Sequence, residues 1–106
     1  MRYMHNLTIV APCYNEEEVL RETTKQLSAL VDRMIAAKKI DSCDIVYIDD
    51  GSRDATWSII EELQTSNKYV HGIKLAHNVG HQNALWAGLE QRVDQCDAIV
   101  SIDADL

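Results

Sequence analysis

Two pairs of carboxylates in this sequence follow apolar runs. Asp49 and Asp50 end the run that begins at Asp44, and Asp103 and Asp105 follow the run 98–102. Carboxylate oxygens suit Mg²⁺ or Mn²⁺, which commonly bridge a protein carboxylate and substrate phosphates. Alternation along an extended chain would place Asp103 and Asp105 on the same side. This second pair predicts a divalent metal site, although an isolated D-x-D is weak evidence by itself.

The first pair belongs to a D-D-G-S segment. Of two adjacent carboxylates that repel each other, only one can point along the strand toward a shared site. That carboxylate could accept a hydrogen bond from an N–H of uracil or guanine. Gly51 permits a tight turn and Ser52 can begin a helix, so a turn with a helix cap is the alternative interpretation. The position of this segment at the end of an apolar run favours the interpretation as a ligand contact.

A third polar segment, Pro12-Cys-Tyr-Asn-Glu-Glu17, follows the first apolar run. Tyr14 could stack on a nucleobase, and Asn15 or Glu16 could hydrogen-bond to base or ribose. Alternatively, Asn15 and Glu18 form a capping pair at the start of a helix, and the glutamates interact favourably with the dipole of that helix.

A fourth segment, 76–84, contains a glycine followed by a histidine. Gly80 lets the backbone turn sharply, and the helix start beyond it would favour an anionic group. His81 could contact a diphosphate or cap that helix, and His77 is a weaker candidate. A Gly-Lys-Ser/Thr phosphate loop, a G-x-G-x-x-G turn after the first strand and a serine nucleophile elbow are all missing.

These segments need elements that position them. Four apolar runs of strand length, at 7–12, 44–49, 70–76 and 98–102, alternate with three helical patterns. The first helix is expected over 16–39, the second follows Ser52 or Asp54, and the third is entered through Gly80. The alternation predicts an α/β fold of three layers, α/β/α, with a mainly parallel sheet. Ligands of such sheets bind beyond the carboxyl ends of the strands.

Length and composition narrow the class of protein. The chain has 106 residues, enough for one domain, and its net charge of −7 argues against a nucleic-acid partner. Its three cysteines form no C-x-x-C pair, so we expect reduced, buried or half-buried thiols in a cytoplasmic protein. A signal peptide and a membrane-spanning run are not indicated.

Together, four ordered motifs resemble the family-2 glycosyltransferases, which have the GT-A (nucleotide-diphospho-sugar transferase) fold. They are Pro12-Cys-Tyr-Asn-Glu-Glu17, Ile48-Asp-Asp-Gly-Ser-Arg-Asp-Ala-Thr56, Asn78-Val-Gly-His-Gln-Asn-Ala-Leu85 and Asp103-Ala-Asp105. The resemblance covers essentially the whole chain. The segment Ala84-Leu-Trp-Ala-Gly-Leu89 is most similar to the branch of dolichol-phosphate mannosyltransferases and bacterial polyprenyl-phosphate sugar transferases.

This resemblance implies a role for each matching position. Asp50 would contact the base with Asp49 nearby, Asp103 would lie near the ribose or donor sugar, and Asp105 would bind Mg²⁺ or Mn²⁺ on the diphosphate, with Asp103 beside it. The remaining nucleotide-sugar contacts would come from Pro12, Tyr14, Asn15, Glu16, Gly80 and His81.

The implied activity is transfer of a sugar, with inversion, from a UDP-sugar or, as second choice, a GDP-sugar. A polyprenyl phosphate is the expected acceptor, and a polysaccharide or cell-surface glycan is the alternative. Family members continue well beyond the Asp-x-Asp. Residues 1–106 are therefore expected to be the nucleotide-sugar-binding part of one domain, truncated after the fourth strand and inactive alone. The catalytic base, the acceptor-binding part and any attachment to the cytoplasmic face of a membrane would lie elsewhere.

Two other classes stay open or are disfavoured. A non-catalytic nucleotide-binding module could keep the fold, although the intact Asp103 and Asp105 argue against it. A nucleotidyltransferase would begin with a Gly-rich basic turn, which Pro12-Cys-Tyr-Asn does not supply. The oligomeric state is not indicated.

Overall fold

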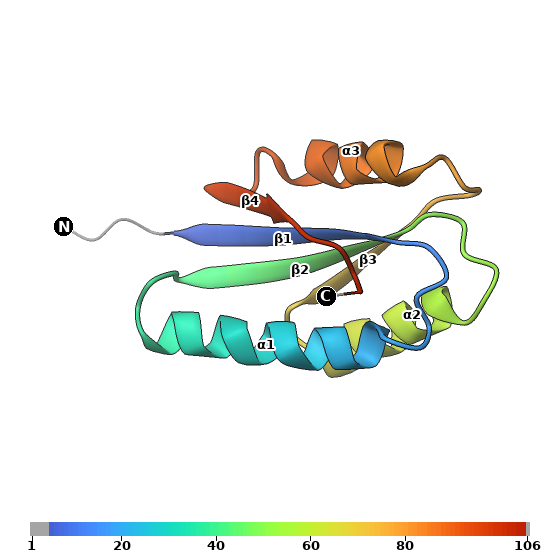
Figure 1. Ribbon diagram of the computed structural model, residues 1–106. Helices are drawn as coiled ribbons and strands as arrows, with labels where there is room; N and C mark the ends of the chain where they lie inside the picture. The colour runs from blue at the N-terminus through green and yellow to red at the C-terminus, as the bar shows by residue number, and fades with distance from the viewer. Residues whose placement is uncertain (1–4, 106) are drawn as a thin grey trace.

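The computed structural model describes residues 5–105, which form one four-stranded parallel sheet with helices on both faces (Figure 1). The strand order is β3-β2-β1-β4. Helices α1 and α2 cover one face, and α3 covers the other. The three-layer α/β/α architecture predicted from the sequence is confirmed. Its elements are β1 (Asn6–Cys13), α1 (Leu20–Ala36), β2 (Ser42–Asp49), α2 (Thr56–Ser66), β3 (Val70–Lys74), α3 (His81–Arg92) and β4 (Ala98–Ser101).

The two central strands, β1 and β2, are buried on both faces, as their nearly continuous apolar sequences require. Alternate residues go to opposite sides. Tyr47 packs with α1 and α2, whereas Val10 and Ile48 pack with Ala84 of α3. Since all four strands run parallel, their carboxyl ends meet at one edge of the sheet. That edge holds the polar segments singled out in the sequence.

The start of α1 differs from the sequence prediction. The helix begins at Leu20 rather than near Glu16, and Val19 precedes it without a side-chain capping bond. The predicted capping pair of Asn15 and Glu18 is therefore wrong. Asn15 has a φ of 54°, and its side-chain oxygen accepts a hydrogen bond from the N–H of Arg53 instead.

The physical reason is that the loops after β1 and β2 form hydrogen bonds with each other. The N–H of Asn15 donates to Ser52 Oγ, and the N–H of Glu16 donates to Thr56 Oγ1. Asp54 accepts from the N–H groups of both Glu17 and Thr56. Of the two residues expected to open the second helix, Asp54 is therefore the one bonded to its first turn. These bonds fix the loop after β1 against the loop after β2.

The three cysteines are free, as predicted: Cys13 and Cys43 are buried and Cys96 is half-buried. Burial and the neighbouring charge of Asp44 raise the pKa of the Cys43 thiol to about 11. Within residues 5–105, helices with the length and apolar character needed to cross a membrane are not found.

Tyr47 offers a test of the core. It is fully buried, and its hydroxyl lies 2.7 Å from Thr24 Oγ1, which donates in turn to the carbonyl of Leu20. The Tyr47 hydroxyl is thus the donor toward Thr24. Replacing Tyr47 with Phe removes one neutral hydrogen bond and strands no donor, so we expect a loss of about 1 kcal/mol in urea unfolding at neutral pH.

The difference in stability between wild type and Tyr47→Phe should shrink at alkaline pH. Burial raises the pKa of the Tyr47 hydroxyl from 10.0 to about 12. Between these two pH values the unfolded chain releases a proton that the folded chain retains. The stability contributed by the protonated Tyr47 hydroxyl is therefore complete below pH 10.0 and is lost as pH rises through about 12. Wild type should therefore lose stability faster than Tyr47→Phe across that interval. Parallel pH dependence of the two proteins would contradict this assignment.

Candidate functional site

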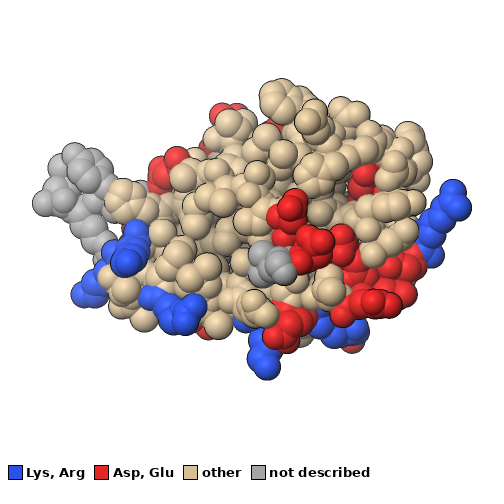
Figure 2. Space-filling model, in the orientation of Figure 1, with Lys and Arg blue, Asp and Glu red and all other residues tan. Residues whose placement is uncertain are grey.

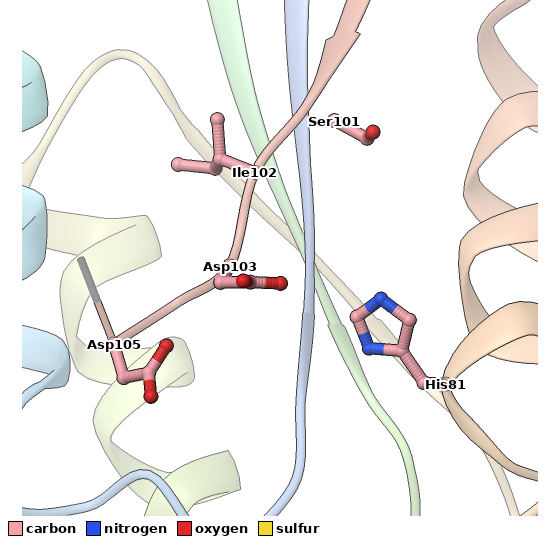
Figure 3. A pocket seen from close by; sticks show the side chains of 5 residues that line it. All are labelled: His81, Ser101, Ile102, Asp103 and Asp105. Atoms are coloured by element: carbon pink, nitrogen blue, oxygen red, sulfur yellow. The ribbon is translucent and has the colours of Figure 1, made fainter.

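Two adjoining pockets lie at the carboxyl edge of the sheet, where the predicted site residues gather. The first has a volume of about 440 Å³ and is lined by His81, Ser101, Ile102, Asp103 and Asp105 (Figure 3). The second, of about 220 Å³, is lined by Pro12, Cys13, Tyr14, Glu16, Asp50, Asn78, Gly80 and His81. His81 is the first residue of α3 and lines both, so the two pockets share a wall.

The Asp103-Ala-Asp105 segment is anchored through its middle residue. Ala104 is buried, and its carbonyl accepts a hydrogen bond of 2.6 Å from Thr23 Oγ1 on α1. This anchoring leaves both flanking carboxylates exposed and lining the first pocket, although residues 104 and 105 form a turn rather than an extended strand. In Figure 3, the Asp103 carboxylate extends toward His81 of α3.

Acidic side chains surround this edge of the molecule (Figure 2). Burial and the negative charges of Asp105, Asp54 and Asp103 raise the pKa of the Glu16 carboxyl above its usual value. The Glu16 carboxyl therefore interacts electrostatically with carboxylates of both the first pocket and the loop after β2. The acidic patch around the pockets consists of Glu16, Glu17, Glu18, Asp54, Asp103 and Asp105.

The carboxylate pair fits a metal ion that is shared with a ligand. Among residues 5–105, groups of three or more His, Cys, Asp or Glu side chains arranged to hold a metal are not found. Mg²⁺ is usually held by one or two carboxylates together with substrate phosphates rather than by a complete protein cage. Asp103 and Asp105, exposed in an open pocket, match that incomplete donor set.

The adjacent carboxylates Asp49 and Asp50 diverge. Both are buried, but Asp49 accepts a hydrogen bond from the N–H of Ser52 and is not among the residues lining either pocket. Asp50 lines the second pocket. Its two oxygens accept hydrogen bonds from the N–H groups of Val79 and Gly80 and from the side-chain amide of Asn78.

Two glycines with positive φ shape the loops here. Gly51 has a φ of 68°, and a Cβ there would lie 2.4 Å from the backbone nitrogen of Asn78. Gly80 has a φ of 96°, and apart from its own chain neighbours no atom lies within 4 Å of where a Cβ would lie; it directly precedes α3. The loop after β2 therefore packs tightly on the loop after β3, while Gly80 provides the turn into the helix.

The remaining predicted residues divide between the second pocket and its surroundings. Pro12, Tyr14 and Glu16 line the second pocket, and Tyr14 is exposed. Asn15 lies beside it, bonded to the loop after β2.

Sequence reasoning gave no role to Cys13 or Asn78, which also line the second pocket, or to Thr23, which anchors Ala104. The places of Cys13 and Asn78 inside two of the four motifs were a usable signal. Nothing in the sequence around Thr23 points to its partner 81 residues away.

Comparisons with known proteins agree on one family. The family described as "Glycosyl transferase family 2" matches residues 8–106. The chain is 52% identical over 101 residues to an uncharacterized glycosyltransferase, YkoT, of Bacillus subtilis, covering 94% of this chain and 30% of that protein. It is 35% identical over 104 residues to the undecaprenyl-phosphate 4-deoxy-4-formamido-L-arabinose transferase of Pectobacterium atrosepticum, covering 95% of this chain and 29% of that protein.

Solved structures show the same fold. A mannosyltransferase from Pyrobaculum calidifontis in complex with GDP-Man and Mn²⁺ superposes with a TM-score of 0.77 at 20% identity, covering 97% of this chain and 28% of that one. TarS of S. aureus in complex with UDP-GlcNAc gives a TM-score of 0.69 at 21% identity, covering 94% and 26%. The chain thus spans under a third of the length of these proteins.

Proposed function

Because the chain belongs to glycosyl transferase family 2 and is related to polyprenyl-phosphate sugar transferases, we propose that it forms the donor-binding part of a metal-dependent, inverting glycosyltransferase. One observation carries the proposal. A pocket with two exposed carboxylates adjoins a pocket with an exposed tyrosine at the carboxyl edge of a parallel sheet, and His81 lines both. An elongated ligand with a base at one end and a phosphate-linked sugar at the other fits this arrangement.

The nucleoside is assigned to the second pocket. Tyr14 stacks on the base, Pro12 forms the apolar wall, and Glu16 accepts hydrogen bonds from the ribose hydroxyls. The diphosphate then lies toward Gly80 and His81, where the N-terminal N–H groups of α3 favour an anion. The segment around Gly80 and His81 therefore holds the diphosphate, which is the negatively charged part of the donor.

The donor sugar and the metal are assigned to the first pocket. Asp103 faces the sugar or ribose, and Asp105, with Asp103 beside it, holds Mg²⁺ or Mn²⁺. When bound, such an ion offsets the charge that develops on the departing nucleoside diphosphate. The protein residues hold the two carboxylates in place through the Thr23–Ala104 hydrogen bond and orient the donor between α1 and α3.

A polyprenyl phosphate is the proposed acceptor. Relatives that are 35–37% identical include bactoprenol glucosyl transferases and the undecaprenyl-phosphate transferase already described. The phosphate oxygen of such a lipid is already anionic, so its attack on the donor needs no strong general base. A glycan hydroxyl, the alternative acceptor, would need one.

Calorimetric titration tests the proposal. UDP, GDP and their sugars would be titrated into the protein, first with Mn²⁺ and then with EDTA. We expect saturable binding of one nucleotide series, UDP before GDP, that EDTA abolishes. Binding that is unchanged in EDTA would favour the non-catalytic nucleotide-binding module. No binding of any nucleotide to a protein shown by circular dichroism to be folded would reject the proposal.

A further inference from the structure

Thr23 lies near the start of α1, and its side chain reaches the segment that carries the two exposed carboxylates. Thr23 is 4% exposed, and Ala104, whose carbonyl accepts the 2.6 Å hydrogen bond from Thr23 Oγ1, is 2% exposed. This length is normal for a hydroxyl donor. Because both residues are buried, removing the hydroxyl would take a hydrogen-bond donor away from a buried carbonyl, which is costly. The bond therefore restrains the Asp103-Ala-Asp105 segment against α1.

The backbone around the two carboxylates is held at two points. The N–H of Ile102 donates to the carbonyl of Val10 at 3.0 Å, just beyond the end of β4. The chain then leaves the sheet towards α1 (Figure 1), where the hydrogen bond from Thr23 holds it a second time. Asp103 lies between these two points, and Asp105 directly follows the second. Since both carboxylates are exposed, their positions depend on this backbone rather than on burial of their own side chains.

The start of α1, which positions Thr23, is itself fixed beside the second pocket. The N–H of Thr23 donates to the carbonyl of Val19 at 2.9 Å, and the N–H of Val19 donates to the carbonyl of Glu16 at 3.2 Å. Glu16 lines the second pocket, and its own N–H donates to Thr56 Oγ1 at 2.9 Å. Hydrogen bonds thus connect a residue of the second pocket, through Thr23, to the backbone between the two carboxylates of the first pocket.

We propose that Thr23 is a positioning residue, which sets the position of Asp103 and Asp105 relative to the second pocket. A nucleotide seated in the second pocket presents its diphosphate to the first. A shared Mg²⁺ or Mn²⁺ binds well only if the carboxylates lie at the right distance from those phosphates. Thr23 acts through the Ala104 carbonyl, so a hydroxyl at residue 23 controls affinity for the metal-bound diphosphate and not for the nucleoside. The proposal rests on the proposed function for the identity of the ligand, but the hydrogen bond exists without a ligand.

Thr23→Val is the test, because valine has nearly the same shape but lacks the hydroxyl. The first readout is ¹⁵N relaxation of the free protein without metal. The amides of Asp103 and Ala104 should have order parameters of about 0.85 in wild type and below about 0.6 in Thr23→Val. Unchanged order parameters would show that burial of the Ala104 side chain holds the segment without Thr23, and would overturn the proposal.

Binding gives the second readout. In calorimetric titration with Mn²⁺, Thr23→Val should bind UDP about tenfold more weakly than wild type, the lower end of the range for residues that orient metal ligands. Affinity for uridine, measured by NMR titration, should change by less than about threefold, because uridine places no phosphate beside the metal. If wild type prefers GDP, then GDP and guanosine take their place. Unchanged affinity for UDP, or equal losses for UDP and uridine, would overturn the proposal.

Two more variants separate this hydrogen bond from a general loss of stability. Thr23→Ser keeps the hydroxyl, so it should keep the segment ordered and bind UDP within about threefold of wild type. Thr24→Val is the matched control, because Thr24 is 2% exposed on the same helix but its hydroxyl bonds to the Leu20 carbonyl and to the Tyr47 hydroxyl. It should lower stability in urea unfolding and leave the ratio of UDP to uridine affinity unchanged. An equal change of that ratio in Thr24→Val, or no rescue by Thr23→Ser, would contradict the proposal.

Two further points keep the test decisive. If the wild-type protein binds no nucleotide, the proposed function fails, while the order parameters of the free protein still decide whether Thr23 holds the segment. If Thr23→Val does not fold, Thr23→Cys supplies a weak S–H donor in place of the hydroxyl. It should lower the order parameters and the ratio of UDP to uridine affinity in the same direction by a smaller factor, and no shift in either would overturn the proposal.

Discussion

Asp105→Asn is expected to lower the affinity for UDP in the presence of Mn²⁺ by about 100-fold or more. Loss of a side chain that hydrogen-bonds to a metal ligand typically lowers the affinity for the metal 10- to 100-fold. Loss of the ligand itself should lower it at least as much, and with it the affinity for a metal-bound nucleotide. The substitution keeps the shape of the side chain and removes its charge. The measurement is calorimetric titration with UDP and Mn²⁺, repeated in EDTA.

The controls separate a metal effect from a general one. In EDTA, wild type and Asp105→Asn should bind UDP equally weakly, because the metal no longer contributes. Asp94→Asn removes the same charge from an exposed residue that does not line either pocket, and it should leave the affinity unchanged. Equal binding by wild type and Asp105→Asn in Mn²⁺ would remove Asp105 from the proposed metal site.

The acidic patch gives a physical reason for expecting dependence on a metal. A nucleoside diphosphate is anionic, and it would have to approach a chain of net charge −7 at its acidic edge. The same accumulation of charge raises the pKa of the Glu16 carboxyl. A divalent cation between Asp105 and the phosphates converts this repulsion into attraction. The start of α3, on the other side of the site, would add a second favourable field for an anion.

Sequence periodicity was sufficient to predict the layers of this fold. The strands β1 and β2 are buried on both faces, so their apolar runs are nearly continuous and hard to mistake. The start of α1 was not predictable, because Asn15 and Glu16 find their partners 38 and 40 residues away in the loop after β2. A local capping rule considers only neighbours along the chain, and here the competing partners come from another loop.

The location of the candidate site was predictable, but the task of each residue was not. Parallel strands bring their carboxyl ends together, so Tyr14, Asp50 and Asp103 had to lie near one edge. The motif around Asp50 carries no sign that its carboxylate accepts three hydrogen bonds from residues 28 to 30 positions later. Contacts of that kind depend on how two loops pack, which neither spacing nor alternation specifies.

Gly51→Ala should be the most damaging glycine substitution at this edge, costing on the order of 3–5 kcal/mol. Its φ of 68° is unfavourable for any residue with a side chain. The new Cβ would also lie 2.4 Å from the nitrogen of Asn78 and 2.6 Å from the carbonyl carbon of His77. Both are backbone atoms, so the overlap can be relieved only if the loop after β2 or the loop after β3 moves.

Gly80→Ala is the matched control, since Gly80 also has a positive φ but open space where a Cβ would lie. It should lose only the backbone term, about 1–3 kcal/mol. Urea unfolding followed by circular dichroism would measure both variants against wild type. A cost for Gly51→Ala no larger than that for Gly80→Ala would mean that the loops after β2 and β3 separate easily. The tight packing of Gly51 on the backbone of residues 77 and 78 would then contribute little to holding the two loops of the site together.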